Sequence, residues 1–177
     1  MVQERHGKLL RNTLKIMYTN VDGLISSLLE LKDYLRTSKP DVVGIVETKL
    51  KEEIKVDFTK EGYNTWRRDR KGMGGGGVML LVKEDIVVEE VEYGDGLAEI
   101  ASVIIRTGGS EKRKIIVVYI PPKTNMWEIN TYKNMHNETR ATLEGMIRKN
   151  YKVLLVGDFN SKEINWEKLE IQENEGP

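Results

Sequence analysis

Six polar side chains that follow apolar segments of the sequence have the chemical types needed for metal-dependent phosphate chemistry. They carry carboxylate, carboxamide or phenol groups: Asn20, Asp22, Glu47, Tyr119, Asp158 and Asn160. Magnesium prefers oxygen ligands, usually one or two carboxylates together with water and phosphate. A bound magnesium ion polarises a phosphoryl oxygen and stabilises the leaving oxygen. The set is therefore suited to phosphoester hydrolysis, provided that the six side chains meet.

The residue types also indicate separate tasks within such a site. Glu47 is the candidate for the main metal carboxylate, and Asp158 for orienting or deprotonating an attacking water. Asn160 is suited to hold the nucleophile or the phosphate, and Tyr119 to hydrogen-bond a phosphate oxygen. Taken singly, each of these residues is more often a turn former at the end of a strand. The functional interpretation therefore depends on their convergence.

Buried strands are predicted directly before these residues. The segments 14–20, 41–47, 113–120 and 151–157 are apolar, and several of them are apolar on both faces, which is typical of central strands. Residues 26–40 have leucines at helical spacing and end at a proline, so they predict a helix between the first two strands. A strand, a helix and a strand form a unit with parallel strands. Parallel strands release their carboxyl ends along one edge of a sheet, so the six side chains are expected there.

The middle of the chain predicts an antiparallel arrangement. Strand candidates separated by turn formers are 63–68, 77–83, 85–92 and 97–106. Residues 128–150 predict a long amphipathic helix, with an inward stripe of Ile129, Tyr132, Leu143, Met146 and Ile147. The whole pattern predicts an α/β fold of two packed sheets with helices on the outer faces.

Four stretches in this order resemble the signature of a known enzyme family. They are LKIMYTNVDGL (14–24), PDVVGIVETKL (40–50), VVYIPP (117–122) and VLLVGDFN (153–160). Their wording, order and spacing resemble the endonuclease/exonuclease/phosphatase family, which includes apurinic/apyrimidinic endonucleases and deoxyribonuclease I. The first two stretches look most like the endonuclease domain of a LINE-type retrotransposon polyprotein. The resemblance covers residues 14–165.

The resemblance implies a four-layer α/β sandwich and magnesium-dependent, or manganese-dependent, nicking of target DNA. It places Asn20, Asp22 and Glu47 in the metal and active-site shell, with Glu47 and Asp22 as metal ligands. It gives Tyr119 a contact with the phosphate or leaving group, Asp158 the activation of water, and Asn160 the positioning of phosphate. In LINE elements a reverse transcriptase domain lies downstream in the same polyprotein, so that domain is an expected partner.

The sequence departs from the family pattern after its last signature. The family has a further Asp and then a Ser/Thr-Asp-His motif, whereas the 17 residues after Asn160 contain no histidine. Neither His6 nor His136 matches the family position. We therefore expect a loose leader (1–13), a domain lacking its last strands, with the second half of the sandwich incomplete (14–165), and a polar tail (166–177). Activity of this chain is expected to be weak or absent.

Basic residues near the glycine run are candidates for DNA contact. Arg67, Arg68 and Arg70 lie beside Trp66 and the glycines at 74–77, and Lys49 follows Glu47. These side chains suit a nucleic-acid backbone. A solvated hairpin loop and a solvated lysine are the alternatives. With 28 basic and 28 acidic residues, the chain is neutral, which excludes a wholly basic surface.

Other features limit the classes of function. The sequence contains no cysteine, which excludes disulfide partners and thiol chemistry. It shows no signal peptide and no membrane-spanning run, so a nuclear or cytoplasmic protein that is not secreted is expected. Two alternatives stay open: a catalytically dead remnant that binds DNA or protein, and a family member that acts on RNA, phosphoinositide or sphingolipid.

Overall fold

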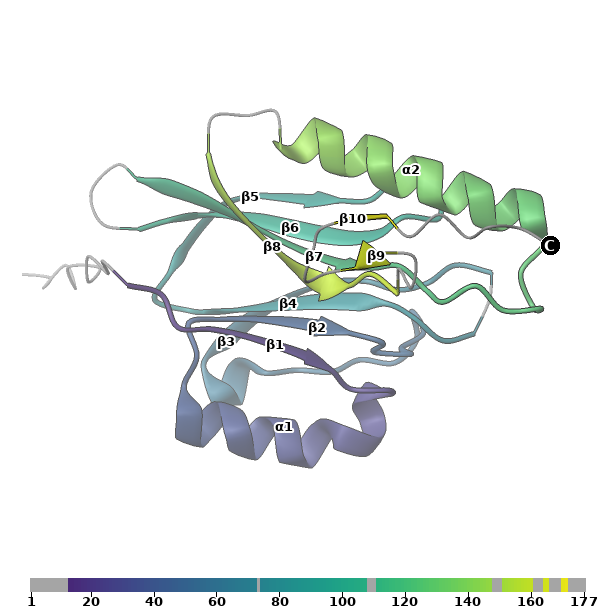
Figure 1. The fold of residues 1–177 in the computed structure, drawn as a ribbon. Helices are drawn as coiled ribbons and strands as arrows, with labels where there is room; N and C mark the ends of the chain where they lie inside the picture. Colours follow the sequence, from purple (N-terminus) through teal and green to yellow (C-terminus); the bar gives the residue numbers. More distant parts are fainter. Residues whose placement is uncertain are drawn as a thin grey trace, which may run out of the picture.

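The computed structural model describes residues 13–72, 74–107, 111–147, 151–160, 164–165 and 170–171. Two four-stranded sheets pack face to face, and one long helix covers the outer face of each (Figure 1). The order of strands is β1-β2-β4-β3 in the first sheet and β5-β6-β7-β8 in the second. The predicted α/β sandwich with four layers is confirmed. His6 and almost all of the predicted leader and tail lie outside the described residues.

The first sheet contains the predicted parallel unit. It consists of β1 (Ile16–Asn20), α1 (Leu24–Ser38) and β2 (Val42–Val46), and the two strands are parallel with Asn20 opposite Val46. On α1, the buried residues Leu24, Leu31 and Leu35 pack on the outer face of this sheet. Lys39 then takes a left-handed conformation and its N–H donates to Leu35 O at 3.1 Å, which ends the helix before Pro40.

The middle strands are antiparallel, as predicted. The bounds are β3 (Tyr63–Arg68), β4 (Val78–Lys83), β5 (Val87–Tyr93), β6 (Glu99–Arg106) and β7 (Lys112–Tyr119), with a short 3₁₀ helix, η1 (Thr59–Glu61), before β3. The strand β4 pairs with both β2 and β3, and β6 pairs with both β5 and β7. The β3–β4 hairpin and β6 therefore flank the strands that end at the predicted site.

The second sheet ends with a second parallel pair. The helix α2 (Ile129–Ile147) connects β7 to β8 (Lys152–Asp158), and Tyr119 lies opposite Asp158 in the register. A short antiparallel pair, β9 (Ile164–Asn165) and β10 (Glu170–Ile171), follows. Within the described residues, no helix is long and apolar enough to cross a membrane.

The predicted inward stripe of α2 is partly wrong. Met146 is buried and Leu143 packs beside it, but Ile129 and Ile147 are 74% and 47% exposed. The actual stripe starts at Met135 and continues through Thr139, both buried. Each residue advances a helix by about 100°, so Ile147 points away from a stripe that includes Met146. Ile129 lies six residues before Met135 and is turned by about 120° from the stripe.

The two sheets approach each other closely at Gly44 of β2. A Cβ added there would lie 3.0 Å from Val156 Cγ2 and 3.4 Å from Val117 Cγ2. Glycine therefore allows β2 to pack directly on β7 and β8.

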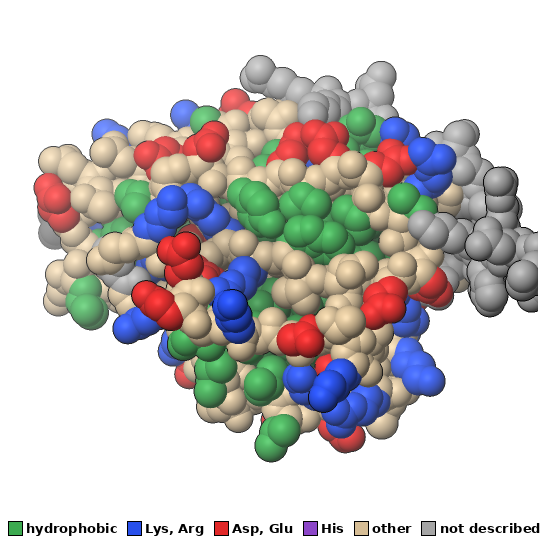
Figure 2. Space-filling view, turned by 180° about the vertical axis from the view of Figure 1, so that it is seen from behind, with side chains coloured by type: hydrophobic (Ala, Val, Ile, Leu, Met, Phe, Trp, Pro, Cys, Tyr) green, Lys and Arg blue, Asp and Glu red, His purple; other side chains and the backbone are tan. Residues whose placement is uncertain are grey.

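From behind, hydrophobic side chains gather at mid-height between charged groups (Figure 2). The strands β3 and β5 lie at the edges of the two sheets. Their partly buried residues Trp66 and Val88 pack against the core between the sheets.

Candidate active site

The side-chain amide of Asn20 joins two carboxylates from different sheets. Its Nδ2 donates to Glu47 Oε1 at 3.0 Å and to Asp158 Oδ2 at 3.3 Å. Its Oδ1 accepts a hydrogen bond from the backbone N–H of Asp22 at 3.0 Å. A backbone N–H can only donate, so this bond fixes the amide orientation and leaves Nδ2 facing the carboxylates. Three of the six predicted residues therefore meet at one point.

Tyr119 holds Glu47 from the second sheet. Its hydroxyl donates to Glu47 Oε1 at 2.9 Å, so the same oxygen accepts from both Asn20 and Tyr119. Burial and then the Glu47 carboxylate raise the pKa of Tyr119 well above its usual range. The phenol is therefore a protonated donor at neutral pH. The predicted direct contact of Tyr119 with phosphate stays a prediction.

The backbone around Glu47 is held in an unusual conformation. Glu47 has a φ of 55°, in the left-handed region that few non-glycine residues adopt. Its carbonyl accepts from Gly23 N at 2.8 Å. The next two amides, Thr48 N and Lys49 N, donate to Gly77 O at 3.3 Å and to Gly76 O at 2.8 Å. The glycine run therefore has a direct part in aiming the Glu47 side chain.

Asn160 braces the turn that follows Asp158. Its backbone N–H donates to Asp158 Oδ1 at 3.2 Å, and its Nδ2 donates to Ile120 O at 3.0 Å. Ile120 N in turn donates to Asp158 O at 2.8 Å. These bonds lock the ends of β7 and β8 together and orient the Asp158 carboxylate. A role of Asn160 in holding phosphate stays a prediction.

Asp22 and Lys49, predicted as a metal ligand and a DNA contact, form an ion pair with each other. The Asp22 side chain is 81% exposed and that of Lys49 is 40% exposed. The hydrogen bond and the charge of Lys49 lower the pKa of the Asp22 carboxyl. Asp22 is therefore ionised at neutral pH; its backbone N–H donates to Asn20, whereas its carboxylate pairs with Lys49 beside the site.

The donor set fits a magnesium ion held by few protein ligands. Among the described residues, no group of three or more His, Cys, Asp or Glu side chains is close enough to hold a metal. Glu47 and Asp158 nevertheless supply two carboxylates bridged by one amide. Magnesium usually keeps several waters and binds one or two carboxylates plus substrate phosphate. The site is therefore suited to an ion that is shared with a substrate.

The three predicted DNA-binding arginines all donate to the protein itself. Arg67 donates to the carbonyls of Ile54 at 2.6 Å and Lys51 at 3.2 Å. Arg68 donates to Gly96 O at 2.7 Å, and Arg70 to Glu99 Oε1 at 2.6 Å. Their guanidinium groups therefore tie the β3–β4 hairpin to its neighbours, and contact with DNA stays a prediction.

Two residues at the site, Tyr18 and Glu99, are not among those predicted from the sequence. Tyr18 precedes Asn20 by two positions on β1, so the two side chains share one face of the strand. Burial, followed by the charges of Asp158 and Glu47, raises the pKa of Tyr18 to about 12. Strand alternation is the signal that predicts this placement. Glu99 lies opposite Tyr119 in the β6–β7 register, and only the pairing of these strands reveals it.

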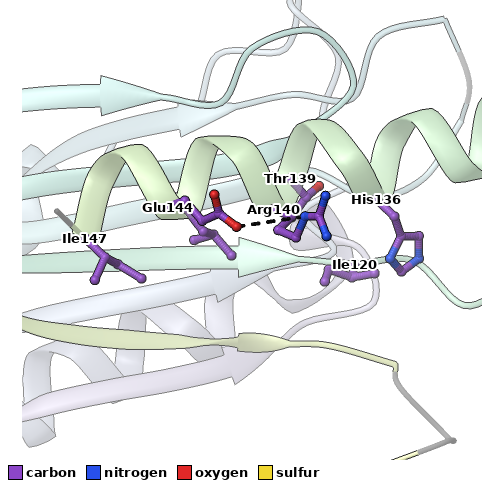
Figure 3. A pocket seen from close by; sticks show the side chains of 7 residues that line it. Ile120, His136, Thr139, Arg140, Glu144 and Ile147 are labelled. Carbon is purple, nitrogen blue, oxygen red and sulfur yellow. Dashed lines mark ion pairs between the residues drawn. The ribbon is translucent and has the colours of Figure 1, made fainter.

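A separate apolar pocket lies between α2 and the end of β7. It is lined by Ile120, His136, Thr139, Arg140, Leu143, Glu144 and Ile147 (Figure 3). Arg140 and Glu144 form an ion pair of 3.9 Å along the helix. His136 is half-buried on α2, with its ring 4.6 Å from that of Tyr132, as a helix residue rather than a member of the site. None of the six predicted site residues lines this pocket.

Comparisons with solved structures agree with this fold. An AP endonuclease from Archaeoglobus fulgidus has a TM-score of 0.67 at 23% identity, covering 86% of this chain and 60% of that one. A 3' phosphatase, NExo, from Neisseria bound to a product DNA hairpin has a TM-score of 0.66 at 19% identity, covering 90% and 65%. The Xenopus laevis APE2 catalytic domain has a TM-score of 0.64 at 19% identity, covering 83% and 58%. The chain thus spans about three fifths of the length of these proteins.

The family is shown by a sequence match. The model of the endonuclease/exonuclease/phosphatase family matches residues 17–176, which is nearly the whole chain. The match contains three of the four predicted signature segments and all but the first three residues of 14–24, and it includes Asn20, Glu47 and Asp158. The chain belongs to the endonuclease/exonuclease/phosphatase family.

Proposed function

We propose that this chain is a DNA endonuclease domain that uses a divalent metal ion to hydrolyse a phosphodiester. The observation that carries the proposal is the amide of Asn20, which donates to both Glu47 and Asp158. Two carboxylates held this close repel each other unless a donor or a cation lies between them. Their placement at the meeting ends of β1, β2 and β8 is suited to a site for a cation and a phosphate.

Each residue has a defined task in this proposal. Glu47 is the main metal carboxylate, and Tyr119 fixes its direction through the 2.9 Å hydrogen bond. Bound Mg²⁺ or Mn²⁺ would neutralise charge on the scissile phosphate and stabilise the leaving oxygen. Asp158 accepts a proton from the attacking water, and Asn160 keeps that carboxylate oriented through its backbone N–H.

The rim of the site supplies the remaining charges. Asp22 is proposed as a further metal carboxylate, and its present partner Lys49 as a contact for the phosphate. Lys49 is suited to this task because its side chain is 40% exposed and carries a positive charge beside Glu47. Arg67 and Arg68 are proposed to flank the DNA backbone, since both side chains are partly exposed at the β3–β4 hairpin.

DNA is the proposed substrate for two reasons. One similar structure, NExo from Neisseria, is bound to a product DNA hairpin. The segments 14–24 and 40–50 also resemble a LINE-type endonuclease, whose nick primes a reverse transcriptase further along the polyprotein. A genomic target would place the protein in the nucleus.

A plasmid-nicking assay tests the proposal. Supercoiled DNA is incubated with the protein and MgCl₂, and open-circle product is quantified for the wild type, Glu47→Gln and Asp158→Asn. We expect each variant to lose at least about a hundredfold in rate, the scale of losing one positioned catalytic group. The control is Glu89→Gln, which breaks ion pairs at the end of β6 that lies away from the candidate site. Equal rates for the wild type and both site variants would refute the proposal.

Other phosphoesters are tested in the same series. NExo is described as a 3' phosphatase, so DNA with a 3' phosphate end is a second substrate for comparison. RNA and a phosphoinositide complete the set. Faster hydrolysis of any of these than nicking of DNA would support the same site acting on a different substrate. Metal and DNA binding without turnover of any substrate would identify a catalytically dead binding domain.

A further inference from the structure

We propose that Arg70 and Glu99 form a buried positioning pair for the active site, and that Arg70 acts on the reaction without contacting DNA. The inference rests on the proposed function for its effect on catalysis. Its structural part concerns only how the glycine run and the Tyr119 ring are held. Arg70 lies in the β3–β4 connection and Glu99 begins β6, so the pair links the two sheets.

The first connection runs from Glu99 through the glycine run to Glu47. Glu99 accepts Arg70 Nε at 2.6 Å on Oε1 and the backbone N–H of Gly77 on Oε2. Arg70 also donates from its NH1 group to Gly74 O at 3.2 Å. Both ends of the glycine run are thus bound by the pair. The carbonyls of Gly76 and Gly77 accept the two amides that follow Glu47.

The second connection runs through Tyr119. The guanidinium carbon of Arg70 lies 5.6 Å from the centroid of the Tyr119 ring and 5.7 Å from that of Trp127. A guanidinium within about 6 Å of an aromatic centroid is attracted to the ring. Glu99 lies beside Tyr119 in the β6–β7 register. Arg70 therefore restrains the ring whose hydroxyl donates to Glu47.

Burial separates this role from a contact with DNA. The side chains of Arg70 and Glu99 are only 11% and 4% exposed. The NH2 nitrogen of Arg70 is fully buried, and no hydrogen-bond partner for it is found within the part of the chain that the structure describes. A phosphate of a bound duplex would have no access to that nitrogen. Burial also raises the pKa of the Glu99 carboxyl, which the Arg70 charge and the Gly77 N–H offset only in part.

Glycine at position 76 allows the pair to lie against the backbone. Gly76 has a φ of 62°, and an added Cβ would overlap both Glu99 Oε2 and the Arg70 guanidinium. The space that a side chain would take is thus occupied by the ion pair. The presence of several glycines is thus explained without a phosphate-binding role. The glycine run brings backbone carbonyls to the Glu47 segment and leaves room for Arg70 and Glu99.

Amide hydrogen exchange measured by NMR tests the positioning directly. We compare Thr48 and Lys49 in the wild type, Arg70→Lys, Arg70→Ala and Glu99→Gln. The control is Arg106→Ala, which breaks an exposed ion pair with Glu89 at the opposite end of β6. In folded protein, the two Arg70 variants and Glu99→Gln are each expected to speed exchange of both amides at least tenfold relative to the control. Lysine should not rescue, because it cannot reach Glu99 and Gly74 with a fixed fork of donors. Unchanged exchange in a folded Arg70→Lys variant would overturn the proposal.

Kinetics and salt dependence separate positioning from DNA contact. For the Arg70 and Glu99 variants, kcat of nicking is expected to fall ten- to a hundredfold, the scale for residues that orient metal ligands, with KM unchanged. The salt dependence of duplex binding is expected to match that of the wild type. A salt slope lower by about one for Arg70→Lys or Arg70→Ala would indicate a phosphate contact and overturn the proposal. If the wild type neither nicks nor binds metal, the proposed function fails, while the exchange rates still decide the role of the pair.

Discussion

The amide nitrogen of Asn20 lies 3.3 Å from Asp158 Oδ2, although 138 residues separate them in the chain. Asn20 ends β1 in the first sheet, and Asp158 ends β8 in the second. The hydrogen bond therefore joins the carboxyl ends of strands from both sheets. A change in how the sheets pack is therefore expected to change the geometry of the site.

A carboxylate at position 20 should make stability depend on a divalent cation. Asn20→Asp removes the donor to Glu47 and Asp158 and adds a third negative charge between them. With EDTA present, we expect the free energy of unfolding to fall by about 1–3 kcal/mol, the cost of leaving polar groups unpaired. Saturating Mg²⁺ should raise the melting temperature of the variant more than that of the wild type, because the ion offsets the added charge.

The measurement is thermal melting followed by circular dichroism. Asn64→Asp is the control, since Asn64 lies exposed on β3 and the same charge change there should have little effect. An Asn20→Asp protein that melts like the wild type in EDTA would contradict the proposed bridge.

The contact between the sheets at Gly44 should tolerate no added methyl group. In Gly44→Ala the new Cβ would press on Val156 and Val117 of the second sheet. We expect a loss of about 1–3 kcal/mol in the free energy of unfolding, the usual cost of overpacking a core. Nicking should slow as well, because Val156 precedes Asp158 by two residues on β8.

Urea unfolding measures this prediction, with Gly145→Ala as the control. Gly145 lies in α2, and nothing lies within 4 Å of an added Cβ. That substitution should stabilise the protein by about 0.5–1 kcal/mol, because alanine favours a helix interior. If Gly44→Ala raises the urea midpoint as Gly145→Ala does, the close approach at Gly44 is not a constraint.

Alkaline pH should destabilise the protein partly through Tyr18. Burial and the charges of Asp158 and Glu47 raise its pKa to about 12, whereas an unfolded tyrosine ionises near ~10. The folded state thus favours the protonated phenol. Its contribution to stability is complete below pH ~10 and is lost as the pH rises towards 12.

We therefore expect the urea midpoint of the wild type to fall more between pH ~9 and pH ~11.5 than that of Tyr18→Phe, over a window set by these two pKa values. Tyr34→Phe on α1 serves as the control for losing a tyrosine elsewhere. An equal fall in the wild type and Tyr18→Phe would show that Tyr18 does not feel the charges of the site.

Much of the fold could be predicted because hydrophobic periodicity is a local property. The residues of β2 are all buried, as the apolar character of both faces of 41–47 predicts. The parallel pairs β1–β2 and β7–β8 follow from strand–helix–strand order. The meeting of Asn20 and Glu47 then follows from the common edge of the parallel strands β1 and β2, whereas Asp158 reaches them through the packing of the second sheet on the first.

The contacts that could not be predicted depend on pairing between distant segments. Glu99 carries no local signal, and its place beside Tyr119 appears only once the register of β6 and β7 is known. Arg70 has the same composition signal as Arg67 and Arg68, and only its burial distinguishes it. The ion pair of Asp22 and Lys49 similarly depends on how two loops meet.

Calorimetric titration with Mn²⁺ tests the central claim most directly. The wild type, Glu47→Gln and Asp158→Asn are titrated, because both substitutions keep the shape of the side chain and remove one charge from the bridged pair. We predict one site in the wild type and at least about tenfold weaker binding in each variant. A wild-type protein that binds no Mn²⁺, or variants that bind it as tightly as the wild type, would contradict the account.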